Sequence, residues 1–492
     1  MSGGESLRVA GVAQTVLRSR SGRLFYGTFP ADGIDIADAA RRPLFPRLAD
    51  AWRRVLETRG RLLKKRGLHL YVLICPEAHF IYREEVPDHL LLPAESPGGQ
   101  FARLMSGIDN VTIVHPEARL LQARGGLDVY RANDTHWSTY GAFVAYRALI
   151  DALAPGTPMR PLRAAQIDYR SVRSFGDLGA LVEPEMPLQA PVPQVRVGTT
   201  WDVWNRVDEQ RNAWLRTASD RGRGRLFITR DSFATHMGAY LQHTFERVDW
   251  LGTTSRLFLE AIDEEKPDVV VWEIAERRLH RIEPDQYPTT AYETFAYDAR
   301  SAAGKTALAA CDQRDAGNVP RALVAANEAL ELSPEDGNLR YLRGTLHLRL
   351  GDGLAAQQAA QQAIAIRDDR PAYWQLLASA FRLQGLANDA LIASRTAATL
   401  SPDNAFHVAE FGADLLQQGD ITQAVDVMSR CREDVSTSKL LCYRLAEAWS
   451  CAGATDRAQA EAQHALLLDP DDPLVQRLVA RLESSLNSPR GA

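Results

Sequence analysis

The chain has 492 residues, of which 45% are apolar and 24% are charged, and its formal net charge is −5 at pH 7. This length exceeds what one hydrophobic core supports, and with an ordinary composition it indicates two or three globular domains. The slight acidity, with a sequence pI near 6.2, argues against a protein whose main partner is nucleic acid.

The N-terminal segment, residues 1–20, reads MSGGESLRVAGVAQTVLRSR. It has neither a continuous apolar stretch nor a small-residue cleavage site, so it does not predict a secretory signal. No window of about 18 uncharged apolar residues follows, so we expect no transmembrane segment. This segment alone predicts a cytoplasmic protein or one that has lost a targeting segment.

Short apolar runs rich in Val, Ile and Leu follow in residues 21–282 and are predicted to be strands. They are LHLYVLIC (68–75), NVTIVHP (110–116), GRLFITR (224–230), RVDWL (247–251) and PDVVVWEIAE (267–276). Helical patterns such as YGAFVAYRALIDALA (140–154) separate them. This alternation predicts an α/β domain with a mostly parallel sheet, whose functional groups should gather at the carboxyl ends of the strands.

The stretch RANDTHWSTYGAFVAY (131–146) is the first candidate for chemistry. If it is extended, Asp134 and His136 face the same side, and the carboxylate can fix the tautomer of the imidazole. Ser138 would cap the helix that follows. The alternative is a purely structural hydrogen bond between Asp134 and His136.

The second candidate is RLFITRDSFATHMGAYL (225–241), in which a strand runs directly into Asp231 and Ser232 and then into a helix. A serine on such a turn exposes its hydroxyl, and the first N–H groups of the helix are free to stabilise an oxyanion. The alternative is that Asp231 or Ser232 only caps the helix. Together the two stretches supply an aspartate, a histidine and a serine, the residue types of a catalytic triad.

Two further features concern charge and metal binding. The last predicted strand leads into Glu273, Glu276 and Arg277, for which catalysis and an anchoring ion pair are both open. The five cysteines have no metal-binding or redox spacing. We therefore expect no metal site and no cofactor.

The C-terminal part repeats every 34 residues. The columns are Gly317, Gly351, Gly385, Gly419 and Gly453; Ala322, Ala356, Ala390, Ala424 and Ala458; and Ala329, Ala363, Ala397, Cys431 and Ala465. Each unit reads as two helices joined by a turn at the glycine. Residues 303–472 resemble the tetratricopeptide repeat family in five copies, and 473–492 would be a capping helix and tail. The resemblance implies a concave surface that binds a protein partner; the alternative is a spacer.

The N-terminal part resembles a second family. In order, SGRLFYG (21–27), VLICPEAHFIY (72–82), DTHWSTYGA (134–142), RDSF (230–233) and VWEIAERRL (271–279) are similar to the SGNH hydrolase-like domain of the AlgX and AlgJ alginate O-acetylation proteins. The resemblance implies a three-layer αβα domain that attaches acetyl groups to the hydroxyls of an exopolysaccharide through an acyl-serine intermediate. It also implies that Ser232 is the nucleophile, His136 the general base and Asp134 its orienting carboxylate.

The sequence departs from this family at two points. Arg230 stands where the Gly-Asp-Ser type of block has glycine, and it would either clamp an anionic sugar or acyl donor or make a structural ion pair. The side chain of Trp137, directly after His136, is expected to line the substrate site. The family's carbohydrate-binding module is missing and the repeats stand in its place, so polymer binding must come from the catalytic face or from a partner.

The sequence thus predicts an N-terminal segment (1–20), a catalytic domain (21–282), a linker (283–302), the repeats (303–472) and a capping helix with a tail (473–492). The expected activity is an O-acetyltransferase acting on a polysaccharide or other glycan. A glycan acetyl esterase and a non-catalytic scaffold in exopolysaccharide biosynthesis are the alternatives. The family implies a glycan acceptor, an acetyl-donating membrane protein and a periplasmic or envelope location, whereas the acetyl donor and the partner of the repeats stay open.

Overall fold

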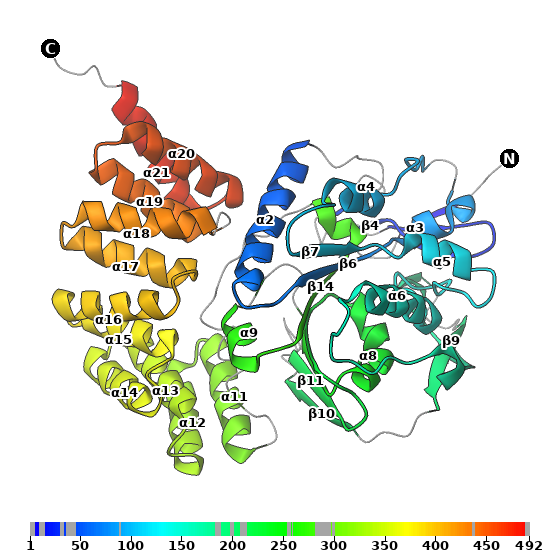
Figure 1. Ribbon diagram of the computed structural model, residues 1–492, viewed down its shortest axis with the longest axis horizontal. Coiled ribbons are helices and arrows are strands. Elements are labelled where there is room, and N and C mark those ends of the chain that lie inside the picture. Colours follow the sequence, from blue (N-terminus) through cyan, green and yellow to red (C-terminus); the bar gives the residue numbers. More distant parts are fainter. Residues whose placement is uncertain are drawn as a thin grey trace. The chain divides into compact units, whose positions relative to one another are not determined.

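The computed structural model describes residues 5–8, 15–29, 34–35, 46–87, 90–182, 188–196, 201–206, 214–252, 257, 259–280, 297, 301–434 and 438–487 (Figure 1). The chain divides into two compact units. The first comprises Met1–Leu257 and Glu265–Ile282, and the second comprises Phe258–Glu264 and Glu283–Ala492. Most of the predicted linker 283–302 lies outside the described residues.

A seven-stranded sheet of order β10-β11-β13-β12-β14-β6-β7 crosses the described part of the first unit. The bounds are β6 Leu70–Cys75, β7 Val111–Val114, β10 Trp201–Arg206, β11 Trp214–Ser219, β12 Arg225–Thr229, β13 Arg247–Leu251 and β14 Val269–Ala275. The strands from β13 to β7 are parallel, and β11 and β10 add an antiparallel edge. The predicted α/β fold with a mostly parallel sheet is therefore confirmed.

Helices cover both faces of this sheet. On one face, Trp52 of α2 (Pro46–Lys64) packs against Trp272 of β14, with ring centroids 5.4 Å apart. The neighbouring Val271 belongs instead to a buried cluster with Tyr146 of α6 (Thr139–Ala152) and Tyr240 of α8 (Gly238–Thr244). Because successive residues of a strand face opposite sides, these contacts define three layers.

Shorter elements complete the first unit. The helices are α3 Ala78–Ile81, α4 Pro97–Leu104, α5 Glu117–Ala123 and α7 Asp177–Val182, with short 3₁₀ helices η2 Arg83–Glu85, η3 Ala164–Gln166, η4 Phe233–Met237 and η5 Glu276–His280. Helix α9 (Leu259–Glu265) belongs to the second unit except for its last residue. The small sheets contain β1 Glu5–Arg8, β2 Thr15–Arg18 and β3 Leu24–Tyr26; β4 Thr28–Phe29 and β5 Ile34–Asp35; and β8 Ile167–Ser174 and β9 Leu188–Val195.

The carboxyl ends of the parallel strands place polar residues along one edge of the sheet. Glu77 follows β6, His115 follows β7, Ser232 follows β12 and Glu276 follows β14. Because these strands are parallel, the residues that follow them meet at the same edge. This edge carries the candidate chemistry of the chain.

The second unit is built from paired helices (Figure 1). They are α11 Ala302–Asp315, α12 Val319–Leu332, α13 Gly337–Arg349, α14 Gly353–Ile366, α15 Pro371–Leu383, α16 Ala387–Leu400, α17 Ala405–Gln417, α18 Ile421–Asp434, α19 Lys439–Cys451 and α20 Thr455–Leu468. The glycine between the helices of each pair has φ between 74° and 81°, a left-handed conformation that favours glycine.

Both alanine columns of the repeat lie in the core of this unit. Every member is at most 3% exposed, including Cys431, which replaces alanine in one copy. Side chains this small let the paired helices approach closely, so stacking the pairs buries one continuous core. Helix α21 (Pro473–Asn487) follows, and its Leu478 and Leu482 pack on Ala458 and Ala462 of the last pair. Within the described part of the chain, no helix is long and apolar enough to cross a membrane.

Candidate active site

The turn that carries Ser232 is held by the side chain of its neighbour Asp231. Asp231 Oδ1 accepts a hydrogen bond of 2.9 Å from the N–H of Phe233, and Oδ2 accepts one of 2.6 Å from the N–H of Ala275. Ser232 is exposed, and its side chain makes no capping hydrogen bond to the helix that follows. Of the two residues considered as caps, Asp231 binds the turn, which leaves the Ser232 hydroxyl available.

His136 lies in the loop that the Tyr130–Trp137 bridge closes, three residues before the start of helix α6. Asp134 Oδ1 accepts hydrogen bonds from the backbone N–H of His136, at 3.0 Å, and from ring Nδ1, at 2.8 Å. The expectation of an extended segment is wrong here, because residues 132–136 form turns and bends. The two side chains meet because the aspartate binds the backbone two residues ahead, as in an Asx turn.

The other ring nitrogen of His136 reaches the serine. His136 Nε2 lies 2.6 Å from Ser232 Oγ, although the two residues are 96 positions apart in sequence. The structure therefore brings Asp134, His136 and Ser232 into one hydrogen-bonded chain. This is the arrangement in which a histidine can take a proton from a serine while a carboxylate stabilises the imidazolium. Ser138 caps helix α6 as predicted, because its side chain accepts from the N–H of Gly141.

A second carboxylate, Asp177, lies beside the same histidine and was not found from the sequence. Its Oδ1 accepts from the N–H of Thr135 at 2.7 Å, and its Oδ2 lies 2.5 Å from Thr135 Oγ1 and 3.5 Å from His136 Nδ1. Asp177 lies 41 residues beyond His136 at the start of α7. No local sequence motif predicts a role for Asp177, because only the fold brings it next to His136.

The two carboxylates have opposite pKa shifts. Burial alone would raise the pKa of Asp134, but the hydrogen bonds and the charge of His136 outweigh it and hold the pKa well below its ordinary value. Burial and the nearby charge of Asp134 raise the pKa of Asp177. Asp134 is therefore the carboxylate that stays charged next to His136. The ligand atoms of Asp134, His136 and Asp177 lie within 4.8 Å of one another, but a cation bound to Nδ1 would replace the Asp134–His136 hydrogen bond.

Trp137 does not line the site, contrary to the expectation from the sequence. Its side chain is fully buried, and Nε1 donates a 2.9 Å hydrogen bond to the carbonyl of Phe233, the residue after Ser232. The two rings also pack edge to face, with centroids 5.2 Å apart. Trp137 therefore supports the serine turn from within, and it cannot contact a ligand in this conformation.

Arg230 also braces the turn. Its Nη1 donates to the carbonyl of Asp231 at 3.1 Å and to Thr235 Oγ1 at 2.9 Å. Within the described part of the chain, no carboxylate forms an ion pair with Arg230. The structural ion pair considered for this residue is thus not seen, and a contact with an anionic substrate stays a prediction.

The charged residues within and directly after the end of β14 anchor the edge of the sheet. Glu273, which is fully buried, accepts a 2.8 Å hydrogen bond from the N–H of Asp231. Arg277 forms an ion pair of 2.9 Å with Glu77, a residue that follows β6. Glu276 accepts from the N–H groups of Glu77 and Gly98. Of the two alternatives for these residues, the contacts support anchoring, with Glu77 as the partner that the sequence did not reveal.

Two backbone N–H groups beside Ser232 are available to an oxyanion. The N–H of Phe233 is bound to Asp231, and that of Thr235 donates to the carbonyl of Ser232. Among the described residues, none accepts from the N–H groups of Ser232 or Ala234. Of the N–H groups expected to be free at the start of the helix, those of Ser232 and Ala234 are therefore the two that could bind an oxyanion.

His236 faces His136 without a direct hydrogen bond. The two ring centroids lie 5.5 Å apart. Burial, with the positive charges of Arg131 and His136, lowers the pKa of His236 to about 4. His236 is therefore neutral near pH 7 and adds no charge beside His136.

Comparison with protein families gives two matches. Residues 35–218 match the model described as "SGNH hydrolase-like domain, acetyltransferase AlgX", and residues 415–482 match the tetratricopeptide repeat model. The first match contains Asp134 and His136 and ends before Ser232. No curated protein matches the chain.

Among solved structures, the O-acetyltransferase domain of Pseudomonas putida AlgJ is 19% identical, with 57% of this chain and 98% of that chain covered and a TM-score of 0.40. Bacillus cereus PatB1 with a sulfonyl adduct is 12% identical, covering 56% and 97%, with a TM-score of 0.42. A thermophilic tetratricopeptide protein of Thermus thermophilus, TTC0263, is 21% identical, covering 38% and 99%, with a TM-score of 0.32. The chain thus joins a region that matches the AlgX-type SGNH hydrolase-like domain to a C-terminal region that matches the tetratricopeptide repeat.

Proposed function

We propose that the first unit is an O-acetyltransferase that acts on a polysaccharide or other glycan through an acetyl-serine intermediate on Ser232. The observation that carries the proposal is the 2.6 Å contact between His136 Nε2 and Ser232 Oγ, with Asp134 on the other ring nitrogen. The match of residues 35–218 to an acetyltransferase family supports the acyl group.

In the first step, Ser232 Oγ attacks the carbonyl carbon of a donor acetyl ester while His136 Nε2 takes the hydroxyl proton. Asp134 stabilises the imidazolium that forms. When the tetrahedral intermediate collapses, the bond between the acetyl carbon and the donor oxygen breaks, and His136 returns the proton to that oxygen. The acetyl group is then an ester of Ser232.

In the second step, a sugar hydroxyl loses its proton to His136 Nε2 and attacks the acetyl-serine. The Ser232–acetyl bond breaks, and the proton returns to Ser232 Oγ. If water takes the place of the sugar, the same residues make the protein an acetyl esterase. In both steps the N–H groups of Ser232 and Ala234 are the donors that we assign to the oxyanion.

The repeats complete the proposal as the site of a protein partner. Repeats of this kind present a concave surface that suits an extended peptide or a protein surface. A partner bound there, or an acetyl-donating membrane protein, would supply the donor ester. The class of glycan and the identity of the acetyl donor must be determined by experiment.

The test is turnover of a chromogenic acetyl ester by the full chain and by two variants, Ser232→Ala and His136→Ala. We expect each variant to lose about 10³-fold or more of kcat/KM, since both act in the same proton transfer. Ser106→Ala is the matched control, because Ser106 is also exposed but bonds only to the carbonyl of Arg103. Wild-type turnover no greater than that of Ser232→Ala would overturn the enzymatic proposal and favour the scaffold.

Transfer is separated from hydrolysis by adding an oligosaccharide acceptor. Mass spectrometry of the acceptor should detect added acetyl groups with the wild type and none with Ser232→Ala. Release of acetate alone, at a rate that the acceptor does not change, would identify an esterase.

A further inference from the structure

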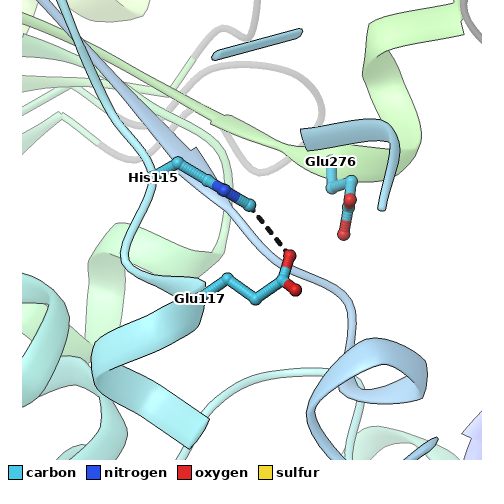
Figure 2. Close-up of side chains that lie close together, drawn as sticks. All are labelled: His115, Glu117 and Glu276. Carbon is cyan, nitrogen blue, oxygen red and sulfur yellow. Dashed lines mark ion pairs between the residues drawn. The ribbon is translucent and has the colours of Figure 1, made fainter. Parts of the chain in front are cut away.

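A second group of titratable side chains lies at the same edge of the sheet and takes no part in the proposed acetyl transfer. His115 directly follows β7, Glu117 begins α5 and Glu276 directly follows β14. Figure 2 shows the imidazole of His115 directed at the carboxylate of Glu117, with the Glu276 side chain close by. One ligand atom of each residue lies within 4.8 Å of the other two.

His115 offers a nitrogen with no hydrogen-bond partner. Its side chain is only 10% exposed, and its Nε2 lies 3.6 Å from Glu117 Oε2, too far for a hydrogen bond. A buried polar nitrogen without a partner costs about 1–3 kcal/mol. Such an atom, directed at one carboxylate and close to a second, is placed where a bound cation would give it a partner.

The two carboxylates are held in place by neighbours that leave part of their oxygens free. Glu276 Oε1 accepts a 2.6 Å hydrogen bond from the N–H of Gly98, and Oε2 accepts one of 2.7 Å from the N–H of Glu77. Glu117 Oε2 accepts from the hydroxyl of Ser96. Each carboxylate oxygen has a second lone pair, and partners of this kind orient the ligands of metal sites.

The charge of this group is not balanced by protein cations. Within the described part of the chain, neither Glu117 nor Glu276 forms an ion pair with Lys or Arg, and the nearby Arg277 is bound to Glu77. Glu276 is 1% exposed. A buried carboxylate without a cation is costly, and a bound metal ion would remove that cost.

Gly98 keeps the space between these ligands open. A Cβ atom at this position would lie 2.6 Å from His115 Nε2 and 3.1 Å from Glu276 Oε1. Gly98 has an ordinary backbone conformation, since it is not among the glycines with positive φ. The requirement for glycine is therefore one of space beside the histidine nitrogen.

We propose that His115 Nε2, Glu117 and Glu276 bind a divalent first-row metal ion, with Zn²⁺ or Mn²⁺ as the best fit. One imidazole nitrogen and two carboxylate oxygens form a mixed donor set that suits these ions better than the all-oxygen sets of Ca²⁺ and Mg²⁺. At a tetrahedral ion, two metal–ligand bonds of about 2.1 Å place their donor atoms about 3.4 Å apart. His115 Nε2 and Glu117 Oε2 lie 3.6 Å apart, so small side-chain rotations complete the site. The ion would tie the ends of β7 and β14 to the Ser96–Gly98 segment, and water would fill its remaining positions.

The test uses the full chain after treatment with a chelator, titrated with Zn²⁺, Mn²⁺, Mg²⁺ and Ca²⁺ in a calorimeter. We expect one equivalent of Zn²⁺ or Mn²⁺ to bind and to raise the thermal unfolding temperature, with Mg²⁺ and Ca²⁺ at least about 10-fold weaker. His115→Gln and Glu117→Gln should each weaken binding by about 100-fold or more, and Gly98→Ala should block it sterically. These readouts do not depend on acetyl transfer.

Two further variants make the test specific. His69→Gln is the matched control, because His69 precedes β6 at the opposite end of the strand and bonds to Thr112; it should bind the ion as the wild type does. Asp177→Asn tests the other candidate group, beside the triad. Glu117→Gln changes a partly exposed residue, so it keeps the test decisive if His115→Gln fails to fold. A wild type that binds none of these ions, or binding lost in Asp177→Asn and retained in Glu117→Gln, would overturn the proposal.

Discussion

Asp134 binds His136 twice, once through the backbone N–H and once through ring Nδ1, with the same carboxylate oxygen. This double contact fixes the main-chain turn and the orientation of the imidazole together. The opposite nitrogen, Nε2, is thereby directed at Ser232 Oγ, 2.6 Å away. The imidazole tautomer that the proposed proton transfer requires thus depends on the Asp134 carboxylate.

The first prediction is that Asp134→Asn lowers kcat by about 10³- to 10⁴-fold while the fold is kept. The amide is isosteric, but its NH₂ group can turn toward Nδ1 and stabilise the wrong tautomer. Asp177→Asn should cost only about 10-fold, since Asp177 lies 3.5 Å from Nδ1 and mainly holds Thr135. Steady-state kinetics of both variants on the acetyl ester make the comparison. If Asp177→Asn were the more damaging change, the roles assigned to the two carboxylates would be reversed.

The second prediction concerns the buried support of the serine turn. Trp137→Phe keeps an aromatic ring but removes the hydrogen bond to the Phe233 carbonyl. We expect a stability loss of about 1–3 kcal/mol and a fall of about 10-fold in kcat with KM nearly unchanged. The matched control is Trp52→Phe, because Trp52 is equally buried and donates to the carbonyl of Leu279 at 2.7 Å from the other face of the sheet.

Denaturant unfolding and steady-state kinetics on both tryptophan variants separate a role in positioning Ser232 from general destabilisation. We expect a similar stability loss in the two variants and a loss of kcat in Trp137→Phe alone. Equal losses of kcat in both variants would contradict the positioning role of Trp137.

Much of the fold could be predicted because it rests on local periodicity. The strands of the parallel sheet are short apolar runs, and the repeat glycines recur every 34 residues. Each of these elements can therefore be identified from the residues of its own segment. The meeting of Asp134, His136 and Ser232 was also predictable, since Asp134 and His136 are two residues apart and Ser232 lies on the turn after a strand. Trp137 was misjudged because an aromatic residue beside a motif has no periodic pattern that reveals which way its side chain points.

The remaining residues of both sites were not predictable from local patterns. Asp177 reaches His136 from a separate helix, and Glu77 reaches Arg277 across 200 positions. His115, Glu117 and Glu276 come together only when β7 and β14 are placed on either side of β6. Such contacts depend on strand order, which a single sequence does not determine. The His-Pro-Glu sequence at the end of the predicted strand 110–116 was the one local signal of the second group.

The third prediction concerns the pH dependence of stability and rests on His79. This fully buried residue lies 3.0 Å from the Tyr26 carbonyl through Nε2, and burial, with the charge of Arg277, lowers its pKa to about 4. The unfolded chain, with a histidine pKa near 6.5, takes up the proton first as the pH falls. Stability that is complete above about pH 6.5 is therefore lost as the pH falls from about 6.5 to about 4, by up to about 3 kcal/mol.

Urea unfolding followed by tryptophan fluorescence at several pH values tests this assignment. His79→Gln retains a side-chain amide that can bond to the Tyr26 carbonyl but has no proton to gain in this range. Its unfolding free energy should consequently fall less steeply than that of the wild type between about pH 6.5 and 4. Parallel curves for the two proteins would show that His79 contributes nothing to the acid sensitivity.

The fourth prediction tests why the repeats require small residues. Ala363 of α14 is fully buried in a cluster with Tyr341 and Ala378, whereas Ala365, two positions further on the same helix, is exposed. Ala363→Leu must push the neighbouring helices apart, which should cost about 1–3 kcal/mol. Ala365→Leu adds the same side chain to the surface and should change stability by no more than about 0.5 kcal/mol. Thermal unfolding followed by helical circular dichroism compares the two variants, and equal shifts would mean that close approach of the helices does not select alanine in this column.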